Sequence, residues 1–359
     1  MSTPHNGAID APTDIRNGEA LDAAAVTDLL RDIFPGVDGP VEIRQFPSGF
    51  SNLTYLVTLG GEEVILRRPP RGTKAAGAHD MGREYRMLMA LRPLFPYCPE
   101  VLYYEDTDAR LGSPFYIMER IRGIILRKNL PAGLSFSPAD AGALCRRLVS
   151  VQRELHAVDY RRVDLGPVKP EGYVARQVDG WSRRYRAART PDAPDFEAVM
   201  AWLADHQPAD TTSPAIVHND FKFDNVVLEP SDPMTIIGVL DWEMATVGDP
   251  LMDLGSSLAY WVQADDAPEL QALRLMPTHI PGALTRREIV GHYGSLSGLD
   301  TGEFSFYYTF GLFRLAVIAQ QIYYRYYKGQ TADKRFEMLI FAVHALEKTA
   351  RMASEEGFI

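Results

Sequence analysis

The chain has 359 residues, of which 46% are hydrophobic and 23% charged, and its formal net charge is -10. This length allows two compact units or one unit with two lobes, and the composition is that of an ordinary globular protein. The negative charge argues against nucleic acid as a partner, because binding to its phosphates needs a basic surface. No apolar run approaches the ~20 residues that cross a bilayer, and residues 1–14 lack the features of a signal peptide. We therefore expect no membrane association and a cytoplasmic location.

The chain contains two cysteines, Cys98 and Cys145. They lie far apart in the sequence, and neither belongs to a group of Cys and His residues with metal-binding spacing. The pattern indicates neither a disulfide scaffold nor a structural zinc site. We expect both side chains to be buried or half-buried.

The first 118 residues predict a leader, two helices and a small antiparallel sheet. Residues 1–20 are rich in Asn, Asp, Gly and Pro without any period, which is typical of a mobile leader. Apolar residues at helical spacing predict helices over 21–34 and 81–91. Alternating or continuous apolar runs between turn residues predict strands, and Gly60-Gly61 predicts a hairpin. The expected strands cover residues 41–46, 53–59, 64–68, 101–105 and 115–118.

From Pro138 onward the pattern becomes mostly helical, with long helices expected over 139–156 and 307–327. One β-rich passage, 216–240, interrupts it. No internal repeat is present. The sequence therefore predicts an α+β protein with a small antiparallel sheet followed by a larger, mainly helical part.

The strongest motif occupies residues 216–228, which read I-V-H-N-D-F-K-F-D-N-V-V-L, and an aspartate follows sixteen positions after Asn225. Together they form an H-x-D-x-x-x-x-N loop and a D-x-x element. Phosphoryl transfer needs a carboxylate that orients the attacking hydroxyl and oxygen ligands that hold Mg²⁺ on the phosphates. Asp220 suits the first role, and Asn225 with Asp241 suits the second.

The spacing of this motif predicts a hairpin, because apolar residues bracket the polar loop and a turn at 229–233 returns the chain. The hairpin would bring Asp241 beside Asn225, so that two oxygen ligands face one Mg²⁺. The alternative is that these residues only cap a polar loop. We expect His218 to have a structural role, since a histidine two residues before the catalytic base more often holds the loop than transfers protons.

This constellation resembles the catalytic loop of the aminoglycoside phosphotransferase and choline kinase family, and the resemblance extends over residues 41–329. It implies a protein-kinase-like bilobal fold, with a leader and N-terminal helix over 1–38, an N-lobe over 39–118 and a C-lobe over 119–359. It further implies ATP and Mg²⁺ as cofactors and a small-molecule hydroxyl as acceptor. Neither the oligomeric state nor a preference for ATP over GTP follows from the motifs.

The resemblance also implies residues for the nucleotide. The turn that covers the phosphates would contain Gly49, Ser51 and Asn52, although such a turn is as often a plain hairpin. Arg67 stands where the family pattern usually has a phosphate-binding lysine, and this is a departure. Its expected carboxylate partner is Glu84, whose alternative is a solvated position on a helix.

One further nucleotide contact and two further motifs follow from the same family pattern. The backbone around Glu119 and Ile121 would bind adenine. Residues 144–159 match an L-x-x-L-H-x-x-D helix, whose His156 would pack rather than react. Residues 247–254 match G-D-P-x-x-D-L, in which the two aspartates, Asp249 and Asp253, would brace the loop and cap the next helix.

Residues 66–70 and 170–181 resemble the branch of this family that is fused to acyl-CoA dehydrogenases and is linked to hydroxyacyl-CoA. A C-terminal part rich in Arg would suit an anionic acceptor. The alternative is that these arginines only lie on the solvent-exposed faces of helices. Aromatic residues over 304–308 and 323–327 would form walls for the acceptor or belong to the core. The arginines in question are Arg146, Arg147, Arg153, Arg161, Arg162, Arg176, Arg183, Arg184 and Arg186.

Three classes of function remain open. A small-molecule kinase is favoured, with an acyl-thioester acceptor preferred over an aminoglycoside. A nucleotide-binding protein without catalysis is disfavoured because Asp220, Asn225 and Asp241 are all present. A protein kinase is disfavoured because Gly248-Asp249-Pro250 follows Asp241 too soon to leave an activation loop.

Overall fold

The computed structural model describes residues 6–47, 52–70, 80–166, 168–331 and 333–358. The chain forms two compact units. The first, here called the sheet unit, contains residues 1–125, 161–166 and 225–245, and the second, the helical unit, contains residues 126–160, 167–224 and 246–359. The sheet unit thus includes residues 119–125, 161–166 and 225–245 in addition to the residues of the expected N-lobe.

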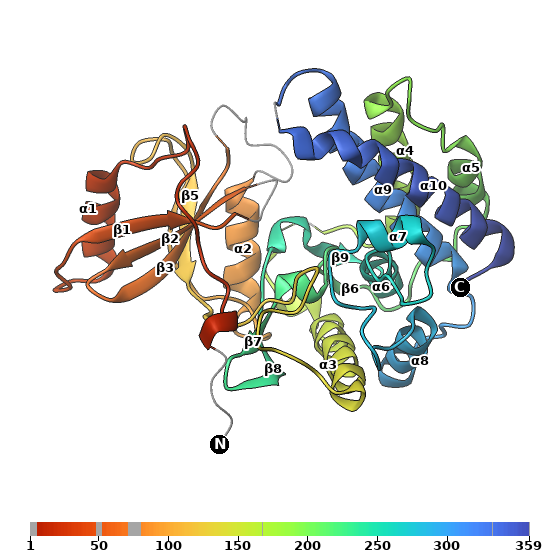
Figure 1. Cartoon of the computed structure of the whole chain (residues 1–359), viewed down its shortest axis with the longest axis horizontal. Helices are drawn as coiled ribbons and strands as arrows, with labels where there is room; N and C mark the ends of the chain where they lie inside the picture. The colour runs from red at the N-terminus through yellow and green to blue at the C-terminus, as the bar shows by residue number, and fades with distance from the viewer. Residues whose placement is uncertain (1–5, 48–51, 71–79, 167, 332, 359) are drawn as a thin grey trace. The chain divides into compact units, whose positions relative to one another are not determined.

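The sheet unit contains the five-stranded antiparallel sheet that the sequence predicts (Figure 1). Its strand order is β1-β2-β3-β5-β4. Gly60 and Gly61 make the turn between the second and third strands, and their φ angles of 58° and 100° suit glycine. The strands are β1 (Val41–Gln45), β2 (Leu53–Leu59), β3 (Glu62–Arg68), β4 (Val101–Glu105) and β5 (Phe115–Glu119).

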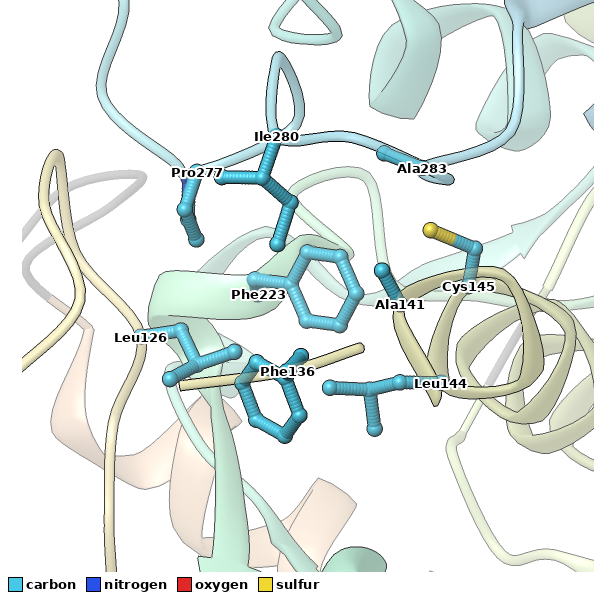
Figure 2. A pocket seen from close by; sticks show the side chains of 9 residues that line it. All are labelled: Leu126, Phe136, Ala141, Leu144, Cys145, Phe223, Pro277, Ile280 and Ala283. Carbon is cyan, nitrogen blue, oxygen red and sulfur yellow. The ribbon is translucent and has the colours of Figure 1, made fainter. Parts of the chain in front are cut away.

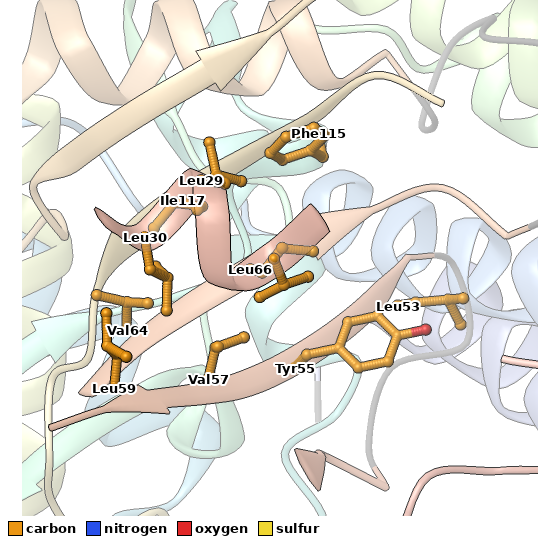
Figure 3. Close-up of a cluster of buried hydrophobic side chains, with 11 residues drawn as sticks. Leu29, Leu30, Leu53, Tyr55, Val57, Leu59, Val64, Leu66, Phe115 and Ile117 are labelled. Carbon is orange, nitrogen blue, oxygen red and sulfur yellow. The ribbon is translucent and has the colours of Figure 1, made fainter. Parts of the chain in front are cut away.

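Two helices cover opposite faces of this sheet. Side chains alternate between the faces along each strand. Tyr55, Leu66 and Ile117 point to the face where Leu29 and Leu30 of α1 (Ala23–Ile33) complete an apolar cluster (Figure 3). The other face carries Arg67 of β3 and lies toward α2 (Met81–Leu91). The sheet therefore has an apolar side and a side that positions charged groups.

Part of the expected mobile leader is hydrogen bonded to this sheet. A short 3-10 helix, η1 (Asn6–Ala8), is followed by bridges from Ile9 to Ile124 and from Thr13 to Gln45. The Thr13 amide donates to the Gln45 carbonyl at 2.7 Å. These are backbone contacts, which is why the aperiodic side-chain pattern of residues 9–13 could not predict them.

A two-stranded hairpin also belongs to the sheet unit. It consists of β7 (Val226–Glu229) and β8 (Asp232–Val239), preceded by η4 (Phe223–Asn225) and followed by η5 (Trp242–Met244). Ile124 pairs with Leu228 of this hairpin. A Cβ at Gly123 would lie 2.4 Å from the Leu228 carbonyl oxygen, so the close approach of the two segments requires glycine there.

The helical unit is organised around the long helix α9, which packs against α4, α6 and α10 (Figure 1). The predicted long helices over 139–156 and 307–327 correspond to α3 and α9. None of the helices in the described part combines the length and apolarity that a bilayer crossing needs. The elements are α3 (Pro138–His156), η3 (Tyr160–Arg162), α4 (Tyr173–Ala188), α5 (Glu197–Asp205), β6 (Ala215–Val217), β9 (Thr246–Gly248), α6 (Pro250–Leu258), α7 (Pro268–Leu273), α8 (Arg286–Ser297), α9 (Ser305–Tyr327), η6 (Lys334–Met338) and α10 (Leu339–Glu356).

Helices α6 and α9 cross at two glycines. A Cβ at Gly311 would lie 2.1 Å from the carbonyl oxygen of Gly255, so the helix backbones touch. Aromatic side chains near the start of α9, including Phe304 and Tyr308, are buried. This burial supports the core interpretation for residues 304–308. Cys98 and Cys145 are buried as expected.

Candidate functional site

The predicted catalytic loop follows β6 in the helical unit, and a buried carboxylate holds its backbone. Asp253 on α6 accepts hydrogen bonds from the amides of His218 at 3.2 Å and Asn219 at 2.5 Å. His156 binds the same carboxylate at 2.9 Å through Nε2. The prediction that Asp253 braces the loop is confirmed, as is the packing role of His156.

The environment of Asp253 explains its charge. Burial alone would raise the pKa of this carboxyl, but the hydrogen bond from His156 and the nearby His218 outweigh burial and lower the pKa below its usual value. Asp249 accepts from the Leu251 amide at 2.8 Å and caps α6, as predicted.

Asp220 is held by its neighbours in the same loop. The ammonium group of Lys222 forms an ion pair with Asp220 Oδ2 and lies 3.5 Å from Asp224 Oδ1. The Asp220 amide donates to Nδ1 of His218 at 3.3 Å, so this histidine holds the loop, as expected. The Asp220 side chain remains 19% exposed, whereas that of Lys222 is 8% exposed. The carboxylate is thus fixed and yet accessible.

Lys222 was not predicted from the sequence as a functional residue. Burial would lower its pKa, but Asp220 and Asp224 together raise it, so the ammonium stays charged. Its Nζ atom also lies 4.9 Å from the ring centre of Tyr260. A lysine two positions from an aspartate on either side, in an otherwise apolar run, is the signal that could have identified it.

In the sheet unit, Arg67 lies among three carboxylates. Its Nη2 donates to Asp241 Oδ1 and, at 3.2 Å, to Glu243 Oε2. Its Nε lies 3.4 Å from Glu84 Oε2, so the expected Arg67–Glu84 pair is present. Asn52 donates to Glu243 Oε2 at 2.8 Å. Glu243 was not identified from sequence; its place two residues after Asp241 is the signal.

The hairpin returns Asp241 toward Asn225, as the spacing predicts. Val226 pairs with Val239, and the Leu240 amide donates to the Asn225 carbonyl at 2.8 Å. Asp241 adopts a left-handed backbone conformation with φ 68°. In the described chain only Phe196, Asn219 and Asp241 have positive φ without being glycine. Two of these three belong to the candidate site, where strained backbone tends to concentrate.

The oxygen donors of the sheet unit fit a hard divalent cation. Asn225 and Asp241 offer an amide and a carboxylate, the ligand types that Mg²⁺ prefers beside phosphate oxygens and water. Within the described ranges, no group of three or more His, Cys, Asp or Glu side chains is arranged as a metal site. Burial raises the pKa of Glu84, partly offset by Arg67. These residues suit a cation whose coordination shell is completed by oxygen atoms of a bound ligand and of water, and not by protein side chains alone.

The other residues assigned to the nucleotide are distributed as follows. Glu119 Oε1 accepts from the Glu100 amide at 2.8 Å. Ile121 packs on the hairpin, since a Cβ at Gly238 would lie 2.7 Å from its Cδ1 atom. Gly49 and Ser51 fall outside the described residues.

An apolar pocket lies behind the catalytic loop in the helical unit (Figure 2). Phe223 of the loop projects into it, and the Phe223 amide donates to the Met276 sulfur at 3.1 Å. Burial raises the pKa of Cys145 to about 11, so its thiol stays protonated. The apolar lining residues pack against Phe223 and so help to hold the catalytic loop in place. Its lining residues are Leu126, Phe136, Ala141, Leu144, Cys145, Phe223, Pro277, Ile280 and Ala283.

Several of the arginines that suggested an anionic acceptor have nearby acidic partners. Arg147 binds Glu154 at 2.8 Å and Arg183 binds Asp179 at 2.9 Å. Arg186 contacts Glu197 Oε2 at 2.6 Å. These ion pairs support the alternative interpretation, in which the arginines lie on the solvent-exposed faces of helices.

The chain matches the model of the phosphotransferase enzyme family, APH, over residues 42–284. The chain belongs to this family. The family match covers both the sheet and the loop that contains Asp220. Phosphotransferase membership and the α+β fold that the sequence predicts are thus both established.

Curated relatives of this phosphotransferase are larger proteins. Acyl-CoA dehydrogenase family member 10 of Mus musculus is 33% identical over 89% of this chain and 30% of its own length. Acyl-CoA dehydrogenase family member 11 of Gallus gallus is 29% identical over 96% of this chain and 44% of its own length. The chain therefore spans less than half the length of these relatives.

Solved structures show the same fold. A candidate aminoglycoside phosphotransferase of Ralstonia eutropha is 26% identical, with a TM-score of 0.77 over 95% of this phosphotransferase and 100% of that chain. Choline kinase from Cryptosporidium parvum is 11% identical, with a TM-score of 0.64 over 93% and 96%. A ternary complex of aminoglycoside phosphotransferase APH(4)-Ia with AMP-PNP and hygromycin B is 16% identical, with a TM-score of 0.57 over 94% and 100%.

Proposed function

We propose that this phosphotransferase moves the γ-phosphoryl group of ATP to a hydroxyl of a small molecule. The observation that supports it most is the accessible carboxylate of Asp220, held by Lys222 within a loop that Asp253 braces. Asp220 would accept a hydrogen bond from the acceptor hydroxyl, orient its oxygen toward the γ-phosphorus and receive its proton. Lys222 keeps this carboxylate from rotating away.

Asn225 and Asp241 would hold Mg²⁺. When bound, the cation supplies positive charge to the phosphates during transfer. Arg67 would orient the Asp241 carboxylate through their ion pair, and Glu84 and Glu243 fix the guanidinium in turn.

The proposal of ATP is supported by the AMP-PNP bound in the solved APH(4)-Ia structure. Backbone groups around Glu119 and Ile121 would bind adenine, and Gly49, Ser51 and Asn52 would cover the phosphates. Arg67 would take the place of the usual lysine, either on the phosphates or through Asp241.

For the acceptor, we propose a hydroxyacyl thioester or a related metabolite. The names of the curated relatives, acyl-CoA dehydrogenase family members 10 and 11, support this class. Aminoglycosides are the alternative, and hygromycin B in the APH(4)-Ia complex supports them. The acid-paired arginines Arg147, Arg183 and Arg186 support neither.

The test is an ADP-release assay with ATP and Mg²⁺ against hydroxyacyl-CoA compounds, amino alcohols and kanamycin-like compounds. We expect turnover with one acceptor class, and kcat/KM compared under one set of conditions identifies it. Asp220→Asn serves as the control, because it should lower turnover at least ~10²-fold with every acceptor. Nucleotide binding without transfer to any acceptor would contradict the proposal and favour a protein that only binds nucleotides.

A further inference from the structure

A buried arginine in the helical unit lacks a carboxylate partner. Arg314 on α9 is 3% exposed, and no hydrogen bond or ion pair joins its guanidinium to the residues that the structure describes. Its recorded contact is with the ring of Trp181 on α4, 5.2 Å from Cζ to the ring centre. Charged side chains are almost never buried without a partner, because loss of hydration disfavours the charge.

Another arginine of the same unit shows the usual solution. Arg286, also 3% exposed, donates to both oxygens of Asp266 at 2.7 Å. This is the bidentate geometry that a guanidinium and a carboxylate favour. Arg314 is equally buried and has the same five donors, but no carboxylate among the described residues accepts from them. A bound anion would satisfy these donors.

The surroundings of Arg314 are positively charged. Arg184 lies over the same Trp181 ring, with its Cζ 4.7 Å from the ring centre. Burial, Arg183 and Arg314 all lower the pKa of Arg184. Two guanidinium groups thus share one indole ring and repel each other. A cation–π contact offsets only part of the cost of burying such a charge, and an anion would offset more.

This position is close to the catalytic loop within the helical unit. Trp181, which Arg314 contacts, lies on α4 together with Tyr173, whose hydroxyl donates to Asn219 Oδ1 of the catalytic loop at 3.4 Å. Burial raises the pKa values of Tyr173 and Tyr260, and the charge of Arg314 opposes this effect. Tyr260 lies over Lys222, which binds Asp220. A molecule bound at Arg314 would therefore lie in the region where the acceptor hydroxyl must approach.

We propose that Arg314 and Arg184, which both contact the Trp181 ring, form a subsite for an anionic group of the acceptor. This group is a carboxylate or a phosphate. The proposal rests on the proposed function in taking the acceptor to lie near Asp220. It specifies the acceptor as a hydroxy compound that carries a negative charge, and it distinguishes that class from polycationic antibiotics.

The subsite can be tested without any turnover. The intrinsic fluorescence of the full chain, which contains 4 Trp, is titrated with succinate and with inorganic phosphate at constant ionic strength. Wild-type protein should show a saturable change, and Trp181→Phe should remove it. Tighter binding of one probe distinguishes a carboxylate from a phosphate ligand.

Substitutions then assign the binding. Arg314→Gln should weaken the probe at least about tenfold, the loss of one charge-assisted contact, and Arg314→Lys should retain part of the affinity. Arg183→Gln is the matched control, because Arg183 lies on the same helix, is exposed and pairs with Asp179. If Arg314→Gln does not fold, Arg184→Gln provides the same comparison at an exposed position.

Two results would overturn the subsite: no saturable change with either probe, or equal affinity in wild type and in folded Arg314→Gln. These outcomes are independent of phosphoryl transfer. A chain that binds the probe through Arg314 and yet transfers phosphate to no acceptor would overturn the proposed function and leave the subsite intact.

Discussion

The sheet unit and the helical unit each place one buried cation among carboxylates, but with different geometry. Arg67 contacts three carboxylates that come from a helix and from the segment after β8, whereas Lys222 contacts two that lie in its own loop. A planar guanidinium with five donors can reach several acceptors at once, while an ammonium acts as a compact point charge. The guanidinium of Arg67 thus suits a site with three acceptors, and the ammonium of Lys222 suits a site with two.

The two clusters also differ in their excess of negative charge. Three carboxylates and one arginine leave two negative charges in the sheet unit, and two carboxylates and one lysine leave one in the helical unit, if all are ionised. On the proposed function, Asp241 of the first cluster binds Mg²⁺ and Asp220 of the second orients the acceptor hydroxyl.

The largest expected effect is on Asp220. Asp220→Asn should lower kcat by at least ~10²-fold, because orienting and general-base carboxylates contribute about 10²–10⁴. Nucleotide affinity, measured by calorimetry, should stay close to that of the wild type. Asp179→Asn, at an exposed salt bridge on α4, is the control. Unchanged kcat would remove Asp220 from catalysis and remove the contrast between the clusters.

Asp241→Ala should abolish the Mg²⁺-dependent part of nucleotide binding while the fold remains intact. A hard cation that has few protein oxygen ligands tolerates the loss of a charged one poorly. Calorimetry with and without Mg²⁺ measures the effect, and circular dichroism checks the fold. Wild-type affinity for Mg·ATP in this variant would mean that the metal site is elsewhere.

Replacing Arg67 by lysine and Lys222 by arginine should show how far each cluster depends on the shape of its cationic side chain. Arg67→Lys should lower the free energy of unfolding by about 1–3 kcal/mol, since one ammonium cannot satisfy three carboxylates. Lys222→Arg should cost a similar ~1–3 kcal/mol for another reason, because a larger group must fit beneath Tyr260. Urea denaturation measures both, with the exposed Arg183→Lys as control. If both exchanges are neutral, the clusters do not depend on cation shape.

The smallest expected effect is on pH dependence, where the units should differ in sign. The folded-state pKa of Asp253 is lowered, so its contribution to stability is present above the unfolded value of ~3.9 and is lost as pH falls. The folded-state pKa of Glu84 is raised, so stability falls as pH rises from ~4.3 toward that pKa. Thermal melts of Asp253→Asn and Glu84→Gln across pH 3–7 test this. Parallel pH profiles for both variants would contradict it.

Helices and strands were predictable wherever the spacing of apolar side chains along the sequence indicates them. The five strands and the helices α2 and α9 follow from apolar spacing, and the hairpin that returns Asp241 follows from the turn at 229–233. Asp253 and Asp249 could be placed because a family motif fixes their distance from the loop. The Arg67–Glu84 pair was predictable from the family pattern, which the resemblance supplied.

Contacts that depend on three-dimensional packing were not predictable. The pairing of residues 9–13 with the sheet uses backbone groups, which no side-chain pattern reports. The interactions of Lys222 and Glu243 depend on which way a loop side chain turns. The contact of Arg314 with Trp181 depends on how α4 and α9 pack, and so does the lack of a carboxylate partner for Arg314 among the described residues.

The left-handed backbone at Asn219 and Asp241 has a consequence for protein engineering. A non-glycine residue in this conformation costs roughly 1–3 kcal/mol, and least for Asn and Asp, whose side chains tolerate it. Glycine at either position would relieve that strain, so selection for heat resistance alone would favour it. The same replacement at 241 would delete the carboxylate that contacts Arg67. Thermostable libraries of this enzyme should therefore be screened for turnover as well as for melting temperature, since the two selections oppose each other at this residue.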